Sequence, residues 1–355
     1  MAVDGEPVLY SLYIYQPSKI APIVFTVLYA LSAVLHVWQC YRYKAFKLVG
    51  LHPTCAVMFT VGYALREYGA YNYLYDQDDK ISLIMFILSQ VFIYVCPPLL
   101  ELANYHVLGR MFYYVPHFAP MPANRVLSIF GGLMAAVELL NALGVALASN
   151  PTSGPTTQTQ GSNLTIAAIS IQIAIITIFM VLAGLFHRRL AQAQIQVPTV
   201  QTILYVLYAS MLLIFARCIY RLIEHLGPIK KDLDNMEALR ALRPLFRYEI
   251  YFLVFESSFM LINSVLWNIW NPGRFLPRYY NVYLAHDGTE VEGHEDTDDR
   301  PLLQKTVHIL SFGLLFQRKR RNYAAEELST YHGGQTRQAH SQSFRSSRLL
   351  ISDTP

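Results

Sequence analysis

The stretch TILYVLYASMLLIFARCIYRLIEHLGP, residues 202–228, carries the strongest structural signal in the chain. Its apolar start has no charged side chain, and about 20 such residues cross the hydrocarbon core of a bilayer. The stretch then carries Arg217, Arg221 and Glu224. These three share one face of a helix because they are spaced i, i+4 and i+7. We therefore predict a membrane helix whose end bears aligned charges.

The composition extends this prediction to the whole chain. Of the 355 residues, 54% are hydrophobic and only 15% are charged, whereas about a quarter of the residues of a soluble protein are charged. The chain is therefore expected to be all-α, a polytopic integral membrane protein. The net charge of +4 is mild and no nucleic-acid-binding motif is present, so no nucleic acid partner is expected. The four cysteines lack the paired spacing of a disulfide framework or a zinc site.

Seven segments approach the length of a membrane span. They divide the chain into an outer N-terminal segment (1–19), a seven-helix membrane domain (20–272) and a tail (273–355). The second span begins close to Pro53, and the third contains Pro97 and Pro98. The predicted spans are Ile20–Cys40, Leu48–Tyr68, Ile81–Ala103, Val126–Ala148, Leu164–Phe186, Val200–Arg221 and Glu249–Trp270.

Basic residues in the short loops orient the spans, since Lys and Arg collect on the cytoplasmic side. The second loop has only Lys80 and the fourth has none, whereas the sixth, which is longer and mixed in charge, opposes the trend. The N-terminus is therefore predicted outside and the C-terminus in the cytoplasm. The basic residues of the first, third and fifth loops are Arg42, Lys44, Lys47, Arg110, Arg125, Arg188 and Arg189.

Two short motifs lie outside the spans. Asn163, in the sequence NLT, is a candidate glycosylation acceptor on the outer side. The tail is predicted to be largely disordered because its composition cannot form a core. Within it, DDRPLL contains Asp298, Leu302 and Leu303 in the pattern of a cytosolic sorting signal that adaptors could read. The plasma membrane is the expected location, with an endosomal or vacuolar membrane as the alternative.

Inserting an ionisable side chain within a membrane span costs roughly 2.5–3.5 kcal/mol, so each such residue is expected to have a structural or functional role. By depth, Arg217 and Glu256 fall at the same level of consecutive spans, and we predict that they pair. One interpretation is a set of structural ion pairs, and the other is a polar cavity or substrate path. We favour the path for Glu138, Arg217 and Glu256. The candidate residues are Arg66, Glu138, Asn141, Arg217, Arg221, Glu224, Glu249 and Glu256.

No enzyme motif is present: there is no Walker loop, glycine-rich nucleotide fingerprint, HExxH or GxSxG. The chain is therefore expected not to be an enzyme, and no cofactor or metal is predicted. Haem ligation by His36, His52 or His106 is conceivable, but no two of them are predicted at a shared depth.

A series of motifs resembles the fungal RTA1-like family of lipid-translocating exporters over about residues 15–273. One is the "R-x-x-[FY]-R-x-x-E-x-x-G" pattern from Arg217 to Gly227, and another is the seven-residue spacing of Glu249 and Glu256. The remaining matches are Tyr15-x-Pro17-Ser18, Leu35-His36, Gly62-Tyr63 with Arg66, Ala103-x-Tyr105 followed by Leu108-Gly109-Arg110, and Asn271-Pro272-Gly273.

The fourth span departs from the family pattern. Met134 stands where the family has an acid and Asn141 where it has a glutamine, while Glu138 lies one turn beyond Met134 and could supply the acid from the same face. Glu256 stands in place of an aspartate, and Asn271 in place of a histidine.

The resemblance implies export or translocation of amphipathic molecules, most of all sphingoid long-chain bases or toxic sterol-like compounds, and resistance to them. A cationic amine head is expected to be drawn to Glu256 and Glu138. The alternatives are a receptor-like seven-helix sensor, a regulator of another transporter, and porphyrin or haem traffic.

Overall fold

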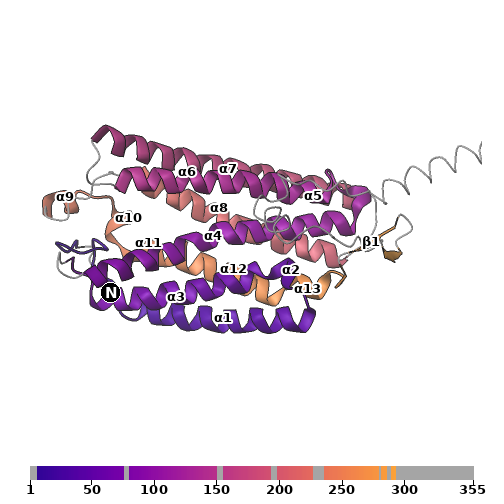
Figure 1. Cartoon of the computed structure of the whole chain (residues 1–355), viewed down its shortest axis with the longest axis horizontal. Helices are drawn as coiled ribbons and strands as arrows, with labels where there is room; N and C mark the ends of the chain where they lie inside the picture. The colour runs from indigo at the N-terminus through magenta and orange to yellow at the C-terminus, as the bar shows by residue number, and fades with distance from the viewer. Residues whose placement is uncertain are drawn as a thin grey trace, which may run out of the picture.

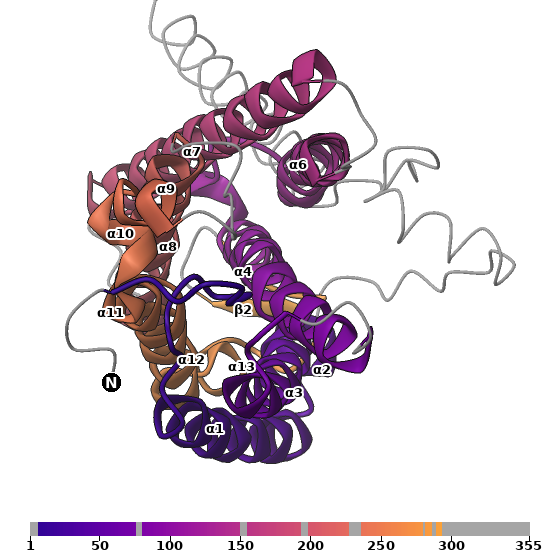
Figure 2. The ribbon, with the colours of Figure 1, turned by 90° about the vertical axis from the view of Figure 1, so that its left-hand side faces the viewer.

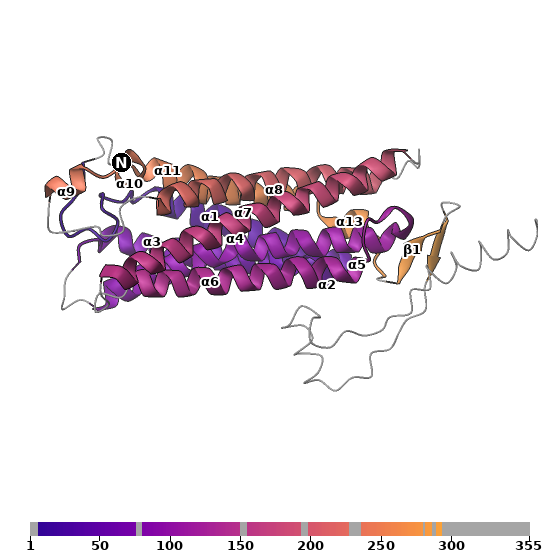
Figure 3. The ribbon, with the colours of Figure 1, turned by 90° about the horizontal axis from the view of Figure 1, so that it is seen from above.

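The computed structural model describes residues 6–75, 80–149, 155–192, 198–226, 236–279, 281–285 and 289–292. These residues form an elongated bundle in which long helices run alternately from one end to the other (Figures 1 and 3). The long segments are α1 (Ala21–Tyr43), α3 (Leu51–Tyr71), α4 (Lys80–Tyr114), α5–η2–α6 (Ala123–Val126, Leu127–Gly131 and Gly132–Ser149), α7 (Pro155–Gln192), α8 (Pro198–His225) and α11–η3–α12 (Glu249–Phe252, Leu253–Ser258 and Phe259–Ile269).

Among the described residues, six helical stretches are long and apolar enough to cross a membrane. They correspond to all the predicted spans except the second, and they make the chain a multi-pass integral membrane protein. The second span, α3, is long enough at 21 residues but is less apolar because it contains His52, Arg66 and Glu67. The six stretches are Ala21–Tyr43, Lys80–Tyr114, Ala123–Ala148, Thr156–Gln192, Pro198–His225 and Glu249–Phe275.

The helix α4 differs most from its predicted span. It continues through Pro97 and Pro98 and ends at Tyr114, eleven residues beyond the predicted end at Ala103. Prolines inside a membrane helix are tolerated where neighbouring helices pack against them. Beside these prolines α4 contacts α3, where Cys96 Sγ lies 3.5 Å from the Cys55 carbonyl and Cys55 Sγ lies 3.6 Å from the Cys96 carbonyl.

The helices pack in two groups that share α8. The helix α3 packs between α1 and α4, while α6 packs along α7. In the end view α4 lies between the α1–α3 pair and the α6–α7 pair (Figure 2). The α6–α7 crossing is very close: a Cβ on Gly161 would lie 2.5 Å from the backbone nitrogen of Ala148. Small residues permit such approaches in membrane proteins.

The N-terminal segment covers one end of the bundle. Leu12 N donates to the Tyr73 carbonyl at 2.9 Å, and Tyr75 N donates to the Tyr10 carbonyl at 2.7 Å, so this segment pairs with the chain that follows α3. Ile14 packs against the short helices α9 (Met236–Arg240) and α10 (Pro244–Arg247) of the loop after α8. The segment is therefore part of the folded structure and closes this end.

The opposite end differs from the prediction of a disordered tail starting at Gly273. Here α2 (Phe46–Val49), the 3₁₀ turn η1 (Pro116–Phe118), α13 (Pro272–Phe275) and the antiparallel strands β1 (Val282–Leu284) and β2 (Glu290–Glu292) form local structure. Arg110 orders this part, because its guanidinium donates to the Tyr279 carbonyl at 2.7 Å and to the Pro277 carbonyl at 3.3 Å. The sorting motif at 298–303 lies outside the described residues.

Candidate functional site

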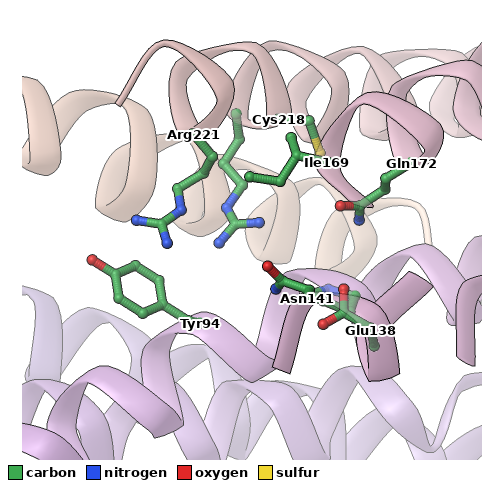
Figure 4. Close-up of a pocket in the computed structure, with 9 residues that line it drawn as sticks. Tyr94, Glu138, Asn141, Ile169, Gln172, Cys218 and Arg221 are labelled. Atoms are coloured by element: carbon green, nitrogen blue, oxygen red, sulfur yellow. The ribbon is translucent and has the colours of Figure 1, made fainter. Parts of the chain in front are cut away.

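A polar cavity lies among four helices in the middle of the bundle (Figure 4). Its water-accessible volume is about 40 Å³, which is room for roughly three water molecules. Four of its lining residues were predicted from the sequence: Glu138, Asn141, Arg217 and Arg221. The full lining is Tyr94 and Pro98 of α4, Glu138 and Asn141 of α6, Ile169 and Gln172 of α7, and Arg217, Cys218 and Arg221 of α8.

The predicted pair of Arg217 and Glu256 is confirmed. Arg217 Nε donates to both carboxylate oxygens of Glu256, at 2.9 and 3.0 Å, and Nη2 donates to Oε1 at 2.7 Å. Both side chains are buried, with Glu256 fully so. Breaking a buried pair of this kind leaves an uncompensated charge, so each residue neutralises the other at the wall of the cavity.

Glu256 lies in η3, a π-helical turn, and such turns occur frequently at functional sites. Two tyrosines from neighbouring helices hold the turn at Ser257. Tyr29 of α1 donates to the Ser257 carbonyl at 2.9 Å, and Tyr63 of α3 donates to the Ser257 hydroxyl at 2.6 Å. The irregular turn is thus held by two hydrogen bonds from the packed pair α1 and α3, and Glu256 of the same turn bonds to Arg217 of α8.

Arg221 belongs to a second pair nearer the end of the bundle. Its Nη1 donates to Glu224 Oε2 at 2.5 Å, one turn further along α8. Its guanidinium also lies 4.1 Å from the ring centroid of Tyr94, in cation–π contact. Figure 4 shows Tyr94 and Arg221 facing each other across the cavity. Both arginines of α8 therefore already have a carboxylate partner.

Glu138 lies on the wall of the cavity opposite Arg221 (Figure 4). Arg217 and Arg221 both act on it electrostatically, but among the described residues Glu138 forms no ion pair within 4.0 Å. Asn141, one turn on, is its hydrogen-bond neighbour. The buried Asn141 Oδ1 has no hydrogen-bond partner in the described structure. The α6 wall thus presents a carboxylate and an amide oxygen that can accept hydrogen bonds.

A further buried carboxylate, Glu101 of α4, lies behind Gln172. Gln172 Nε2 donates to Glu101 Oε2 at 2.9 Å, and the Tyr105 hydroxyl donates to Glu101 Oε1. Gln172 therefore connects the cavity to a hydrogen-bonded group deeper in the bundle. Sequence reasoning missed Gln172 and Tyr94, although an isolated glutamine inside the apolar run SIQIAI was a visible signal.

Arg66 and Glu249 do not line the cavity and form a separate clasp. Arg66 Nη2 donates to Glu249 Oε1 at 3.0 Å and to the Tyr15 hydroxyl at 3.1 Å. Ser18 N donates to Glu249 Oε2 at 2.7 Å. Burial raises the pKa of Tyr15, which lies before the first span, to about 12, so it remains neutral. The candidate polar residues predicted from the sequence thus form two sites, one that anchors the N-terminal segment and one around the cavity.

Two other predictions meet different outcomes. Asn163 lies on an exposed face inside α7 rather than in a loop, and Thr165 of the same motif is buried with its hydroxyl bonded to the Gly161 carbonyl at 3.2 Å. The expectation that no two histidines share a depth is wrong, because the rings of His36 and His52 stack with centroids 5.6 Å apart. The helical periodicity of the sequence predicted neither the hydrogen bond of Thr165 nor the stacking of His36 on His52.

The cavity is lined by charged and amide side chains, and the described part of the chain contains no group of three or more metal-ligating side chains. Of the five charged residues at or beside the cavity, two are arginines and three are carboxylates. An incoming cation with several N–H donors would balance this set and bond to Glu138 and Asn141.

Comparison with known proteins extends over most of the chain. A family model described as RTA1 like protein matches residues 54–279. A lipid-translocating exporter-like protein RTA1 of Leptosphaeria maculans is 52% identical over 321 residues, which cover 89% of this chain and 62% of that relative. The chain thus spans less than two thirds of that protein.

More distant relatives match similar parts of the chain. A protein with the same name in Ajellomyces capsulatus is 29% identical over 255 residues, covering 67% of this chain and 75% of the relative. The probable lipid transporter atnI of Emericella nidulans is 22% identical over 285 residues, covering 75% of this chain and 68% of the relative. No solved structure matches the chain.

Proposed function

The chain belongs to the RTA1-like family, and from that premise we propose that it translocates amphipathic lipids that have a cationic amine head, such as sphingoid bases. The observation that carries this proposal is Glu138, a carboxylate at the cavity without an ion-pair partner in the described structure. The names of relatives as lipid-translocating exporter-like proteins and as a probable lipid transporter support it.

Recognition would use both acceptors of α6. The ammonium group would pair with Glu138 and donate to Asn141 Oδ1, while hydroxyl groups next to the amine would bond to Gln172. The hydrocarbon tail would remain in the bilayer. Glu256, which the sequence suggested as a second ligand for the amine, instead serves as the counter-charge of Arg217, since three hydrogen bonds join the two.

Passage of a lipid requires movement, because a cavity of about 40 Å³ cannot hold its head group. The α6–α7 pair is the element best suited to move. It is tightly joined at Gly144 and Gly161, whereas α6 makes few contacts with α4. The π-helical turn η2 at the start of α6 (Leu127–Gly131) supplies a natural hinge. We therefore infer that separation of α6 from α4 opens the cavity to the bilayer.

We further propose that α3 is a seventh span, with the N-terminus outside, the C-terminus in the cytoplasm and the plasma membrane as location. Support comes from its position between α1 and α4, both of which are long and apolar enough to span. Its one buried arginine, Arg66, is paired with Glu249. The proposed activity is transport without covalent chemistry, so the protein would not be an enzyme.

The test is transfer of a fluorescent sphingoid base in liposomes that contain only this protein. We expect Glu138→Gln to reduce the rate by about tenfold or more, because it removes a charge-assisted hydrogen bond. Glu138→Asp should retain part of the rate. Glu67→Gln serves as the matched control, because it makes the same change at a carboxylate of α3 that does not line the cavity. Unchanged transfer by Glu138→Gln would refute the mechanism.

A receptor-like sensor is the second candidate, and the small volume of the cavity favours it. A sensor would bind the base at Glu138 without moving it across the bilayer. The same liposomes separate the two functions: binding that depends on Glu138, with transfer no faster than in protein-free liposomes, would identify a sensor.

A further inference from the structure

Two histidines meet in the interior of the bundle, away from the cavity. His36 of α1 and His52 of α3 are each 1% exposed, and their rings stack at 5.6 Å with an angle of 21° between the planes. On its other side His52 lies against Trp267 of α12, with ring centroids 5.3 Å apart. Three helices thus enclose a pair of imidazoles that the proposed lipid site does not use.

The enclosure leaves polar atoms without partners. Neither ring nitrogen of His52 has a hydrogen-bond partner in the described structure, and neither does either amide atom of Asn263, one turn before Trp267 on α12. Asn263 is fully buried. Such groups cost roughly 1–3 kcal/mol each when left unmet, and buried polar groups are normally satisfied by protein or water. His52 therefore has a ring-nitrogen lone pair that no hydrogen bond occupies in the described structure.

A chain of hydrogen bonds leads from His36 toward the end of the bundle. His36 Nε2 lies 3.3 Å from the Ser264 hydroxyl, which lies 2.7 Å from the Ser32 hydroxyl. Asn268 Nδ2 donates to the same Ser32 hydroxyl at 2.6 Å. From Asn268 the chain continues through its carbonyl to Gln39 and then to Asn271, at 2.7 and 2.8 Å.

The surroundings select the kind of occupant. His36 is the one titratable group acting on His52 among the described residues, and no carboxylate or basic side chain in that part of the chain acts on either ring. Other titratable side chains of α1 and α3, among them the buried Tyr29, Cys40, Cys55, Tyr63 and Arg66, do not act on either ring. Stacked parallel rings cannot ligate one haem iron from opposite faces, and the described residues contain no group of three or more metal-ligating side chains.

We propose that the His36–His52 pair is a proton-binding site. One proton suits the pair, because two stacked imidazolium ions would repel each other. A protonated His52 would be stabilised by the face of Trp267 through a cation–π contact. The hydroxyls of Ser264 and Ser32 extend the hydrogen bonds from His36, and the amide groups of Asn268 and Gln39, which cannot relay a proton, hold the surrounding helices in place.

The test uses Trp267 as the reporter, since a protonated imidazole in contact with an indole quenches its fluorescence. The chain has three tryptophans, so Trp38→Phe with Trp270→Phe leaves Trp267 alone in the full-length protein in lipid nanodiscs. We expect its emission to fall by about half between pH 8 and pH 4, because burial without a counter-charge disfavours the protonated rings, and to recover on return to pH 8. Reversal excludes unfolding as the cause.

Variants assign the transition to the pair. His52→Phe keeps a ring between His36 and Trp267 but cannot bind a proton, so it should remove the change. His187→Gln, on α7 beside Tyr205 and Tyr208, is the matched control and should keep it. Emission that does not change with pH, or a transition that survives in His52→Phe, would overturn the proposal. No sphingoid base is added, so the outcome is independent of the proposed transport.

Discussion

The Arg217–Glu256 pair is either only a structural clasp or also part of the lipid path, and paired substitutions separate the two. Removing one partner of a buried pair costs about 3–5 kcal/mol, while replacing both by apolar residues is often neutral. We therefore predict that Glu256→Gln strongly lowers the thermal unfolding temperature in detergent. The double variant Arg217→Met, Glu256→Leu should recover most of the lost unfolding temperature.

Transport by that double variant is the informative measurement. If the pair only clasps α8 to η3, the stable double variant should still move the base. If the charges also shape the cavity beside Glu138, the double variant should be as stable as the unchanged protein but should not transport the base. A double variant as unstable as the single one would contradict the interpretation of the pair as mutually neutralising.

Tyr15 gives a milder prediction for the clasp at the covered end. Its hydroxyl accepts from Arg66 at 3.1 Å in a buried setting where Glu249 carries the only nearby negative charge among the described residues. Tyr15→Phe keeps the ring and removes one hydrogen bond to a charged group, so unfolding should be easier by about 1.5–3 kcal/mol. Tyr10→Phe, on an exposed tyrosine of the same segment, should have no effect. Equal stability of both variants would contradict the role of the clasp.

The close crossing of α6 and α7 allows a test within one helix. Gly161→Ala places a Cβ 2.5 Å from the Ala148 backbone nitrogen, whereas Gly184→Ala on the same helix meets nothing within 4 Å. We expect Gly161→Ala to destabilise by about 1–3 kcal/mol, and Gly184→Ala to stabilise by up to about 1 kcal/mol, since alanine favours helix. The measurement is the thermal unfolding temperature of both variants in the same detergent. Similar shifts would contradict the tight crossing.

Sequence reasoning located the helices well, because long apolar runs specify where a chain can span. It also gave the depth of Arg217 and Glu256, and therefore their pairing. Depth says nothing about the direction in which a side chain points around the bundle. For that reason Arg66 and Glu249 were grouped with residues they do not contact, and Gln172 was not assigned to the cavity.

The histidine pair and the ordered start of the tail were missed for the same reason. His36 and His52 lie on different helices, and only the packing of α1 on α3 brings the rings together. The segment after Gly273 is polar, and its order depends on carbonyl groups that bond to Arg110, a residue 167 positions earlier in the case of Pro277. The local composition of a segment cannot predict contacts with residues so far away in the sequence.

The two ends of the bundle give the last prediction, the parity of the crossings. Tyr10 lies exposed at the end covered by the N-terminal segment, and Tyr279 lies exposed beyond the last span. If α3 crosses with the six apolar stretches, these positions lie on opposite sides of the membrane, and without it they lie on the same side. The native cysteines are buried, so introduced thiols should dominate labelling. We expect an impermeant maleimide on intact cells to label Tyr10→Cys, and to label Tyr279→Cys only after permeabilisation. Labelling of both on intact cells would exclude α3 as a seventh span.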